Sequence, residues 1–319
     1  MKILKILIAT ILCLLSATAF PQDKVRVAVF PAISAMPYFV ALERGYFKEA
    51  GIETETIPMT SHPFIVQAFV KGDIEAASNL VTLEGANINQ RRPGTLVYFG
   101  INGQNHVNLV EQFVVRAGHP AQTLKDLKGT RLLSAPGPGN VGAAKAVLKA
   151  IGLEEGRDYT MQEQQMGVHL GALQAGTFDG GYTLEPLASV MVKNGVARRL
   201  EGGVIATYLL GRKDAQAFAA GNALGGEFLA KRPAVAERYA KAIAKGLADA
   251  VKDPKARELL AKHMNVAADV APTVPLARFT LVKDLSAQDL ADFQRFVDIG
   301  VEQKVVAGPI DVKSFLKSY

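Results

Sequence analysis

The sequence predicts an α/β fold of two Rossmann-like lobes with a cleft between them. Two segments about a hundred residues apart follow one pattern, AFVKGDIEAASN at 68–79 and ALQAGTFDGGYT at 172–183. Each has a helix end, a Gly, an apolar residue, an acid and two small residues. Upstream of each, a strand leads through a Pro-containing loop into a helix that ends at Gly51 or Gly152. A module that occurs twice predicts two similar lobes, and clefts between lobes bind small molecules.

The elements of the first module are predicted from apolar runs and their flanking residues. Val25–Phe30 is a near-continuous apolar run, typical of a strand buried on both faces. A helix over Tyr38–Ala50 ends at Gly51, and another ends at Lys71 before Gly72. The elements that follow are a strand at Ile74–Ser78, a helix at Thr82–Arg92 and a strand at Leu96–Ile101. Strands that alternate with helices indicate βαβ units and a largely parallel sheet.

The second module repeats this alternation after an extended stretch, Val107–Arg116, which we expect to cross between the lobes. Its predicted elements are Arg131–Ala135, Val141–Ala150, Tyr159–Glu163, Gly167–Ala175, Phe178–Tyr182, Leu187–Lys193 and Val196–Leu200. Val204–Leu210 is predicted as the returning strand, and the chain is chiefly helical from Gly226 onward. We therefore predict lobe 1 at 24–102 and 208–319 and lobe 2 at 103–207, joined by a two-strand hinge.

The first residues, MKILKILIATILCLLSATAF, have the order of a secretory signal. Two lysines precede a ten-residue apolar run from Ile6 to Leu15, and a small-x-small site ends at Ala19. The apolar run is shorter than the about 20 residues that span a bilayer. We predict a signal peptide over residues 1–19, cleaved near Ala19, and a periplasmic mature protein.

The composition argues against several classes of protein. The single cysteine, Cys13, lies in the predicted signal, so the mature chain would have no disulfide or thiolate site. The net charge is +6, and Lys and Arg are scattered among acids, which gives nucleic-acid binding no support. Ser134 lies in LLSAP rather than in a nucleophile elbow. The spacing of the five histidines is not that of metal ligands; they are His62, His106, His119, His169 and His263. We predict no enzyme activity, no metal and no cofactor.

A glycine-rich loop, GPGNVG at 137–142, follows a predicted strand and opens a helix. It matches G-x-G-x-x-G, the pattern that brings a backbone close to a dinucleotide pyrophosphate. A tight loop that needs glycine for unusual backbone angles is a second interpretation. We favour a third, in which free N–H groups at a helix N-terminus hold an anionic or polar group of a small ligand.

Glu185 closes the second copy of the module, just before a proline. An acid in the first turn of a helix suits the positive end of the helix dipole, which is one interpretation of this residue. A contact with a cationic or N–H-rich ligand, or a latch between the lobes, is the other. The sequence leaves both open.

Other polar and aromatic residues are candidates for the cleft. Ser78, Asn79 and Thr82 can donate and accept there, although Ser and Asn are also common in turns and caps. Tyr38 and Phe64 can stack on a ligand, although aromatic residues at helical spacing also belong to protein cores.

Five segments together resemble one family: PYFVALERGYFKEAGIETE, AFVKGDIEAAS, DLKGTRLLSAPGPG, ALQAGTFDGGYTLEP and EFLAKRPAVAERYAKAI. In order and spacing they are similar to solute-binding proteins of ABC transporters in the nitrate/sulfonate/taurine and thiamine-pyrimidine-precursor group. The resemblance covers roughly residues 24–265. It implies a type II periplasmic-binding-protein fold, venus-flytrap closure and delivery of a solute to a membrane permease. The chain departs from the sulfonate and nitrate binders, which commonly have Trp near the acid-Pro step, because it contains no Trp.

The resemblance also places ligand-binding residues in four loops. They are Ile33, Ser34 and Ala35 after the first strand, Ser78 and Asn79 after the GDIEAAS segment, Gly139, Asn140 and Val141 at the helix N-terminus, and Tyr182, Thr183 and Glu185 in the acid-Pro loop. The helix N-terminus is the part that the resemblance implies grips an anionic or polar head group.

The function predicted from the sequence is capture of a small organic solute between two lobes, for an ABC permease and its ATPase. The preference is for an organic anion, such as a sulfonate or a carboxylate. We expect a monomer with no nucleic-acid partner. Three alternatives stay open: an enzyme on the same fold, similar to menaquinone-pathway dehydratases, a sensory binding module, and a binder of pyrimidine precursors.

Overall fold

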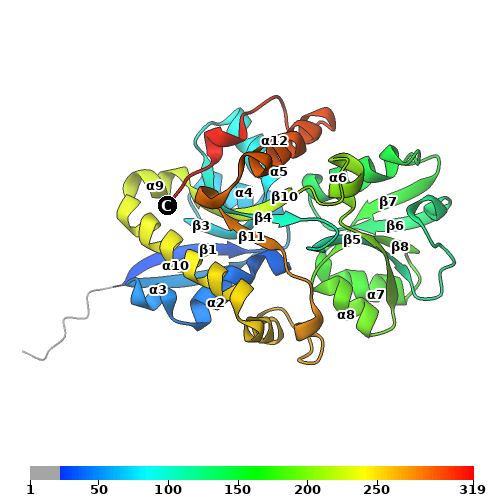
Figure 1. Cartoon of the computed structure of the whole chain (residues 1–319), viewed down its shortest axis with the longest axis horizontal. Coiled ribbons are helices and arrows are strands. Elements are labelled where there is room, and N and C mark those ends of the chain that lie inside the picture. Colours follow the sequence, from blue (N-terminus) through cyan, green and yellow to red (C-terminus); the bar gives the residue numbers. More distant parts are fainter. Residues whose placement is uncertain (1–21) are drawn as a thin grey trace, which may run out of the picture.

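The computed structural model describes residues 22–319, which form two α/β lobes that lie side by side (Figure 1). We call the unit built on the six-stranded sheet lobe 1 and the unit built on the five-stranded sheet lobe 2. Lobe 1 contains both the first and the last third of the chain, and lobe 2 is the green part of Figure 1. The predicted signal peptide lies outside the described residues, and the numbered lobe boundaries stay a prediction.

Each lobe is organised around one mixed sheet. Lobe 1 has the strand order β11-β4-β10-β3-β1-β2, and its strands are β1 (Asp23–Val29), β2 (Ile52–Pro58), β3 (Ala76–Val81), β4 (Leu96–Gln104), β10 (Ala217–Gly225) and β11 (Arg278–Leu281). Lobe 2 has the order β7-β6-β8-β5-β9, and its strands are β5 (Glu111–Arg116), β6 (Thr130–Ser134), β7 (Tyr159–Glu163), β8 (Gly180–Leu184) and β9 (Ala197–Gly202).

The sheets are less parallel than the sequence predicts. The pairs β1–β2, β1–β3, β6–β7 and β6–β8 are parallel. The strands that arrive from the other lobe, β10 and β5, pair antiparallel with both neighbours. Both sheets therefore share one order, in which a strand from the other lobe lies between the third and fourth strands of the module.

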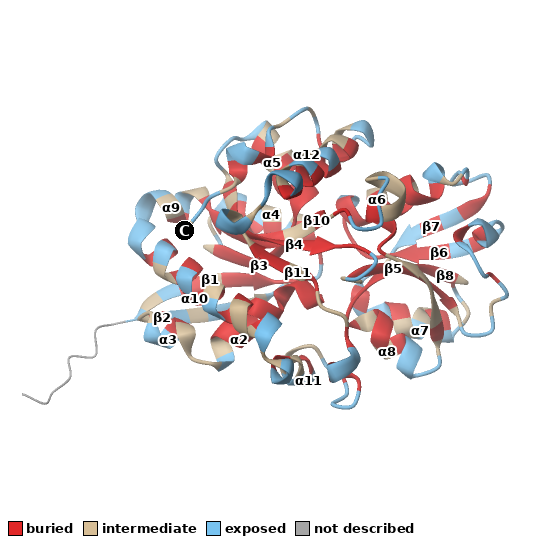
Figure 2. Ribbon diagram, viewed as in Figure 1, coloured by how far each residue is buried: buried red, intermediate tan, exposed pale blue. Residues whose placement is uncertain are grey.

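Helices cover both faces of each sheet (Figure 1). In lobe 1 they are α2 (Met36–Glu43), α3 (Tyr46–Glu49), α4 (His62–Lys71), α5 (Thr82–Arg91), α9 (Gly226–Lys231), α10 (Pro233–Lys252), α11 (Leu259–His263) and α12 (Ala287–Glu302). In lobe 2 they are α6 (Pro138–Ala150), α7 (His169–Gln174) and α8 (Leu187–Lys193). Short 3-10 turns include η1 (Ile33–Ala35) and η3 (Met166–Val168). The strands are largely buried between these layers (Figure 2).

The two copies of the repeated motif make the same contacts. In lobe 1, Glu75 accepts hydrogen bonds from the backbone N–H and the guanidinium of Arg26, which also donates to the carbonyl of Gly72. In lobe 2, Asp179 accepts from the backbone N–H and the guanidinium of Arg131, which donates in the same way to the carbonyl of Gly176. Both glycines have positive φ, of 74° and 72°, a conformation that glycine adopts without strain.

Two predicted elements differ from the structure. The single helix predicted over Tyr38–Ala50 is divided into α2 and α3 at Gly45, whose φ of 74° ends the first helix. The stretch predicted as the returning strand contains a π-helix, η4 (Ile205–Leu209), whose turn is closed by the Leu210 N–H bonded to the Ile205 carbonyl at 3.0 Å. A short apolar run does not distinguish a buried helix from a strand. The strand that returns is β10, with the sequence AFAAGNALG, whose Ala and Gly residues have low β propensity.

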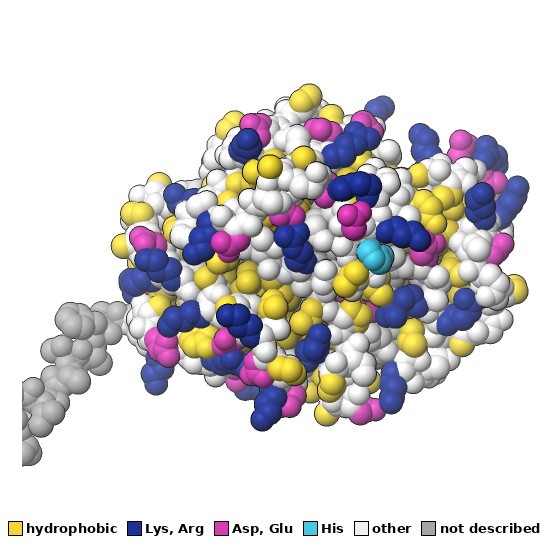
Figure 3. Space-filling model, in the orientation of Figure 1, with side chains coloured by type: hydrophobic (Ala, Val, Ile, Leu, Met, Phe, Trp, Pro, Cys, Tyr) yellow, Lys and Arg dark blue, Asp and Glu magenta, His cyan; other side chains and the backbone are white. Residues whose placement is uncertain are grey.

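The surface and the helices agree with the composition. Lys, Arg, Asp and Glu side chains are interspersed over the face shown in Figure 3, with no large patch of one sign. Among residues 22–319, no helix combines the length and the apolar character that crossing a membrane requires.

Candidate functional site

The loops at the carboxyl ends of the first and third strands of each module meet where the lobes face each other. The N–H of Ile33, after β1, donates to the carbonyl of Glu185, after β8, at 2.8 Å. The N–H of Gly139, in the first turn of α6, donates to Oε1 of Glu84 on α5 at 3.0 Å. Each hydrogen bond joins one lobe to the other. The contact surface is therefore built from the loops that typically carry ligand sites in open α/β sheets.

A small cavity lies at the centre of this contact, and we call it the central cavity. Its volume is about 30 Å³, close to the space that one water molecule takes in the liquid. Its polar lining residues are Ser34, His62, Asn102, Gln104 and Asn140, which come from both lobes. All five are nearly fully buried. The cavity thus offers polar groups that bulk solvent does not reach.

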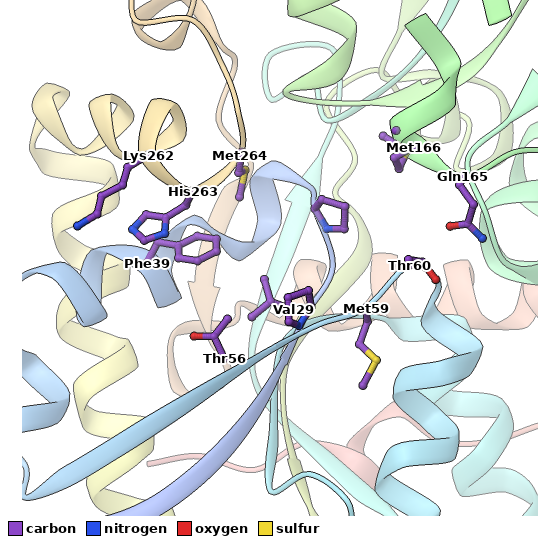
Figure 4. Close-up of a pocket in the computed structure, with 13 residues that line it drawn as sticks. Val29, Phe39, Thr56, Met59, Thr60, Gln165, Met166, Lys262, His263 and Met264 are labelled. Atoms are coloured by element: carbon purple, nitrogen blue, oxygen red, sulfur yellow. The ribbon is translucent and has the colours of Figure 1, made fainter. Parts of the chain in front are cut away.

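The structure also has a larger apolar groove, and Figure 4 shows residues that line its first hollow. It consists of two adjoining hollows of about 490 and 360 Å³, which share Pro31, Met166, Gly167 and Met264. Met59 lines the first hollow and Leu187 the second. We call this surface the methionine groove. Met side chains are flexible and polarisable, so they fit around apolar ligand bodies of irregular shape.

One wall of the groove carries polar groups that already have partners. His263 stacks on Phe39 with 4.2 Å between ring centroids, and its Nε2 lies 2.8 Å from Glu43 (Figure 4). Lys262 donates to the same carboxylate at 2.7 Å. Both basic groups are engaged by Glu43, whose pKa they lower. The groove therefore presents mainly an apolar surface, and the cation nearest to it is neutralised.

Burial controls the charges near the central cavity. Burial raises the pKa of the Glu84 carboxyl to about 7, and the hydrogen bond from Gly139 only partly offsets this effect. Burial also lowers the pKa of His62 to about 3, so its imidazole is neutral at ordinary pH. The Nδ1 of that ring accepts from the N–H of Val81 at 3.4 Å. The site therefore contains an acid that titrates near neutrality and a histidine that does not.

Several residues that the sequence predicts for the site lie together. Asn79 donates to Ser34 Oγ and to the Phe30 carbonyl, both at 3.0 Å, and so fixes the loop after β1. Ser78 donates to Asn79 at 2.8 Å. Asn140 lines the central cavity while its amide donates to the Pro136 carbonyl at 2.7 Å. Of the remaining backbone candidates, Ile33, Ala35 and Gly139 are buried and Val141 is half-buried.

Other candidates lie inside a lobe. Tyr38 is buried in the core of lobe 1, and its hydroxyl bonds Thr56 at 2.6 Å. Tyr182 is buried against Phe113 in lobe 2, with 5.5 Å between the ring centroids. Thr183 bonds Nδ1 of His169 at 3.0 Å. These three contacts correspond to the core interpretation of such residues.

Glu185 has all its carboxylate contacts within lobe 2. It accepts from Arg199 at 2.9 Å, from Gln112 at 2.7 Å and from the N–H of Ser189 at 3.0 Å. The last contact lies in the first turn of α8, as the helix-dipole interpretation expects. The carbonyl of Glu185, rather than its carboxylate, makes the contact with lobe 1.

The sequence did not single out three features of the site. Glu84 appears in the sequence as an isolated acid, because its partner Gly139 lies 55 residues away. Asn102 lies inside a strand, where nothing in the local pattern separates it from structural residues. The groove methionines, Met59, Met166 and Met264, are far apart in the chain. Only the predicted convergence of loops from two lobes could have suggested them.

Among residues 22–319, no cluster of three or more His, Cys, Asp or Glu side chains has the arrangement of a metal site. The glycine-rich loop leads into α6, as the sequence predicts, and the first-turn N–H of Gly139 faces a protein carboxylate. This arrangement places an acid where a pyrophosphate would lie in a dinucleotide site.

Solved structures that share this architecture include binding proteins and an enzyme. The alkanesulfonate-binding protein SsuA from Xanthomonas axonopodis pv. citri, bound to MOPS, aligns with a TM-score of 0.74, 16% identity, and coverage of 94% of this chain and 100% of that chain. The nitrate-binding protein NrtA from Synechocystis PCC 6803 aligns with a TM-score of 0.72, 13% identity, and coverage of 92% and 84%. The desulfurization enzyme DSZB aligns with a TM-score of 0.66, 17% identity, and coverage of 93% and 97%. These similarities confirm the periplasmic-binding-protein fold.

The family is defined by sequence. The family model described as NMT1/THI5 like matches residues 32–257, and the chain belongs to this family. The comparison with curated proteins found no match. The predicted resemblance is thereby confirmed for the family.

Proposed function

We propose that this protein is an extracytoplasmic solute-binding protein that captures a small organic molecule between its lobes and delivers it to an ABC permease. The observation that carries the proposal is the contact between two equivalent lobes, which encloses polar groups and borders an apolar groove. Family membership and the fold shared with sulfonate- and nitrate-binding proteins support it. The signal-like N-terminal sequence supports a periplasmic location.

The lobes close on the solute by movement about the segments that cross between them. A solute that touches both lobes binds the closed form better than the open form and shifts the equilibrium toward closure. The Ile33–Glu185 and Gly139–Glu84 hydrogen bonds form only when the lobes meet. The permease then recognises the closed surface. We infer that the protein acts as a monomer with the permease and its ATPase.

The polar end of the solute is expected in the central cavity and its apolar body in the methionine groove. Ala32 lines the cavity and its neighbour Pro31 lines the groove. In the other loop, Leu184 lines the cavity and Pro186, two residues later, lines the groove. The two spaces therefore border the same pair of loops. The preference for an organic anion as the solute comes from the sequence alone and stays a prediction.

A ligand screen tests the proposed function. The purified mature protein is heated with panels of sulfonates, carboxylates, amines and pyrimidines, and its unfolding temperature is measured. A true solute should stabilise the protein by about 2.7 kcal/mol at a hundredfold excess over Kd. Native mass spectrometry of the exported protein should show a bound solute. If no compound stabilises the protein and no solute co-purifies with it, the proposal fails.

An enzyme on the same fold is a second candidate, because the desulfurization enzyme DSZB shares the architecture. A buried acid with a pKa near 7, Glu84, is the kind of group that acid–base catalysis uses. Incubating the protein with each stabilising compound and analysing the mixture by mass spectrometry distinguishes the two. A chemically changed compound would favour the enzyme, and an unchanged one favours transport or sensing.

A further inference from the structure

The N-terminus of α6 is already occupied by a carboxyl group of the protein. Glu84 extends from α5 of lobe 1, and its Oε1 accepts the Gly139 N–H at 3.0 Å. A Cβ atom at Gly139 would lie 2.6 Å from Oε2 of the same carboxyl, so both oxygens lie against this turn. A helix N-terminus attracts anions through its free N–H groups and its dipole. Here the protein itself supplies the anion.

Two buried acceptor atoms near the contact between the lobes have no hydrogen-bond partner among the described residues. Oε2 of Glu84 is buried and has no hydrogen-bond partner among the described residues. Oδ1 of Asn102, whose residue is 3% exposed and lines the central cavity, also has none within residues 22–319. A buried acceptor that lacks a partner is costly, and a ligand that brings a donor removes this cost. Oδ1 of Asn102, which lines the central cavity, therefore favours a solute that donates a hydrogen bond.

The described residues around the central cavity provide no cation to balance a bound anion. The residues that line it include no Lys or Arg, and its one histidine, His62, is neutral because burial lowers its pKa to about 3. Arg199 lies across the Glu185 side chain and is paired with it at 2.9 Å. The Glu84 carboxyl lies behind this lining, against Gly139, whose neighbour Asn140 lines the cavity together with Val81. An anionic head group in the cavity would therefore be desolvated close to a carboxylate and without a cation, which is unfavourable.

We propose that Glu84 makes this cleft selective against anions, so that the solute presents an uncharged head with an N–H or O–H donor and an apolar body. This inference rests on the proposed function and reverses the preference for an organic anion that the sequence suggests. Glu84 is the residue that determines specificity. Asn102 is the acceptor that the donor of the solute meets, and the methionine groove holds the body.

Because Glu84 titrates near neutrality, the proposal predicts that anion binding depends on pH. Because burial raises the pKa of Glu84 to about 7, its carboxyl is mostly ionised at pH 8 and mostly protonated at pH 6. The titratable groups that interact with it are Tyr98 from β4 and Glu163 at the end of β7, whose charge also raises the Glu84 pKa. His62 from α4 lines the central cavity. His62 and Tyr98 do not titrate between pH 6 and 8. Exclusion of anions should therefore weaken as the pH falls through 7.

Titration calorimetry with a matched pair of probes tests this inference. Benzenesulfonamide is uncharged and has N–H donors, whereas benzenesulfonate has a similar shape and a permanent negative charge. At pH 8 the wild type should bind benzenesulfonamide at least about tenfold more tightly than benzenesulfonate. Glu84→Gln should improve benzenesulfonate binding by about tenfold or more and change benzenesulfonamide binding by less than about threefold.

The control is Glu111→Gln, which neutralises another fully buried carboxyl whose pKa is raised by burial and which accepts from the Ile205 N–H rather than from α6. It should leave the preference between the two probes unchanged. The wild type alone gives a second readout: its affinity for benzenesulfonate should rise as the pH falls from 8 to 6, with little change for Glu84→Gln.

Three results would overturn the inference: equal binding of the two probes by the wild type at pH 8, an unchanged preference in Glu84→Gln, or no binding of benzenesulfonamide to the wild type. Native mass spectrometry that still detects a co-purified solute would then leave the proposed function standing. If native mass spectrometry also detects no co-purified solute, both this inference and the proposed function fail.

Discussion

At the scale of single residues, burial of acids has the largest consequence. Glu111, at the start of β5, is fully buried, and its Oε1 accepts the Ile205 N–H at 3.2 Å. Its Oε2 has no partner among residues 22–319. Burial raises the pKa of this carboxyl to about 8, with a smaller contribution from the charge of Glu201. The folded protein therefore holds a proton that the unfolded chain releases near its ordinary pKa.

This difference makes stability depend on pH. Between about pH 4.5 and 8 the folded state binds more protons at Glu111 than the unfolded state, so stability falls as the pH rises. Glu111→Gln keeps the acceptor for Ile205 and removes this loss. Urea unfolding should show the variant more stable than the wild type at pH 8.5, by on the order of 3 kcal/mol, and little changed at pH 4.5. An equal effect at both pH values would contradict a titrating Glu111.

Residue types alone predict only part of the site. Ser34 and Asn140 line the central cavity, and the loops expected to converge do so. Tyr38 and Tyr182 lie in cores instead, because an aromatic residue near a predicted loop has the same sequence pattern whether it faces the cleft or the interior. Glu84 could not be recognised, because a contact between lobes has no local signature in the sequence.

At the scale of elements, the repeated motif proves to be a structural device rather than a binding one. The acid after the glycine anchors the arginine at the start of the first strand of each module, through Glu75 with Arg26 and Asp179 with Arg131. Each contact combines charge-assisted hydrogen bonds from side chain and backbone, which are stronger than neutral ones. The sequence predicts the duplication, but not what the acids contact, because each partner lies almost fifty residues upstream.

These two contacts give a comparison within one molecule. The side chain of Arg26 is 37% exposed and that of Arg131 is 55% exposed, so solvent weakens the second pair more. Arg26→Ala should cost about 1–2 kcal/mol of unfolding free energy, and Arg131→Ala should cost less. Urea unfolding of both variants measures the difference. A larger loss for Arg131→Ala would show that exposure does not control these pairs.

The returning strand was missed for a physical reason. β10 is rich in Ala and Gly because its neighbours lie close: a Cβ at Gly221 would lie 2.6 Å from the Gly100 carbonyl oxygen. Tight packing between two strands selects small residues, and small residues remove the β-branched signal by which strands are recognised. The returning strand was predicted instead at Val204–Leu210, the apolar run that precedes β10.

At the scale of the whole molecule, the distance to which the two lobes can approach each other depends on small residues at their contact. A Cβ at Gly139 would lie 2.7 Å from Cγ1 of Val81, which belongs to the opposite lobe. Gly139→Ala should therefore disfavour closure while leaving lobe 2 folded. Solution scattering should show a larger radius of gyration than for the wild type, and the affinity for the solute found in the screen should fall.

Gly118→Ala is the matched control, because a Cβ at that exposed position meets no atom within 4 Å and the residue lines neither the central cavity nor the methionine groove. It should keep the dimensions and the affinity of the wild type. If both variants scatter alike, the Gly139 contact does not limit closure.

The strand order of lobe 1 has a consequence for how the polypeptide acquires its shape during synthesis. β10 separates β3 from β4, yet it leaves the ribosome only after every strand of lobe 2. The sheet of lobe 1 therefore lacks β10 at the time when all strands of lobe 2 are already available. Lobe 2 can then fold first, because domains generally fold as units. A nascent chain that ends before residue 217 therefore has every strand of lobe 2 but lacks the strand at the middle of the lobe 1 sheet, so lobe 1 can complete its sheet only after lobe 2 has been synthesised.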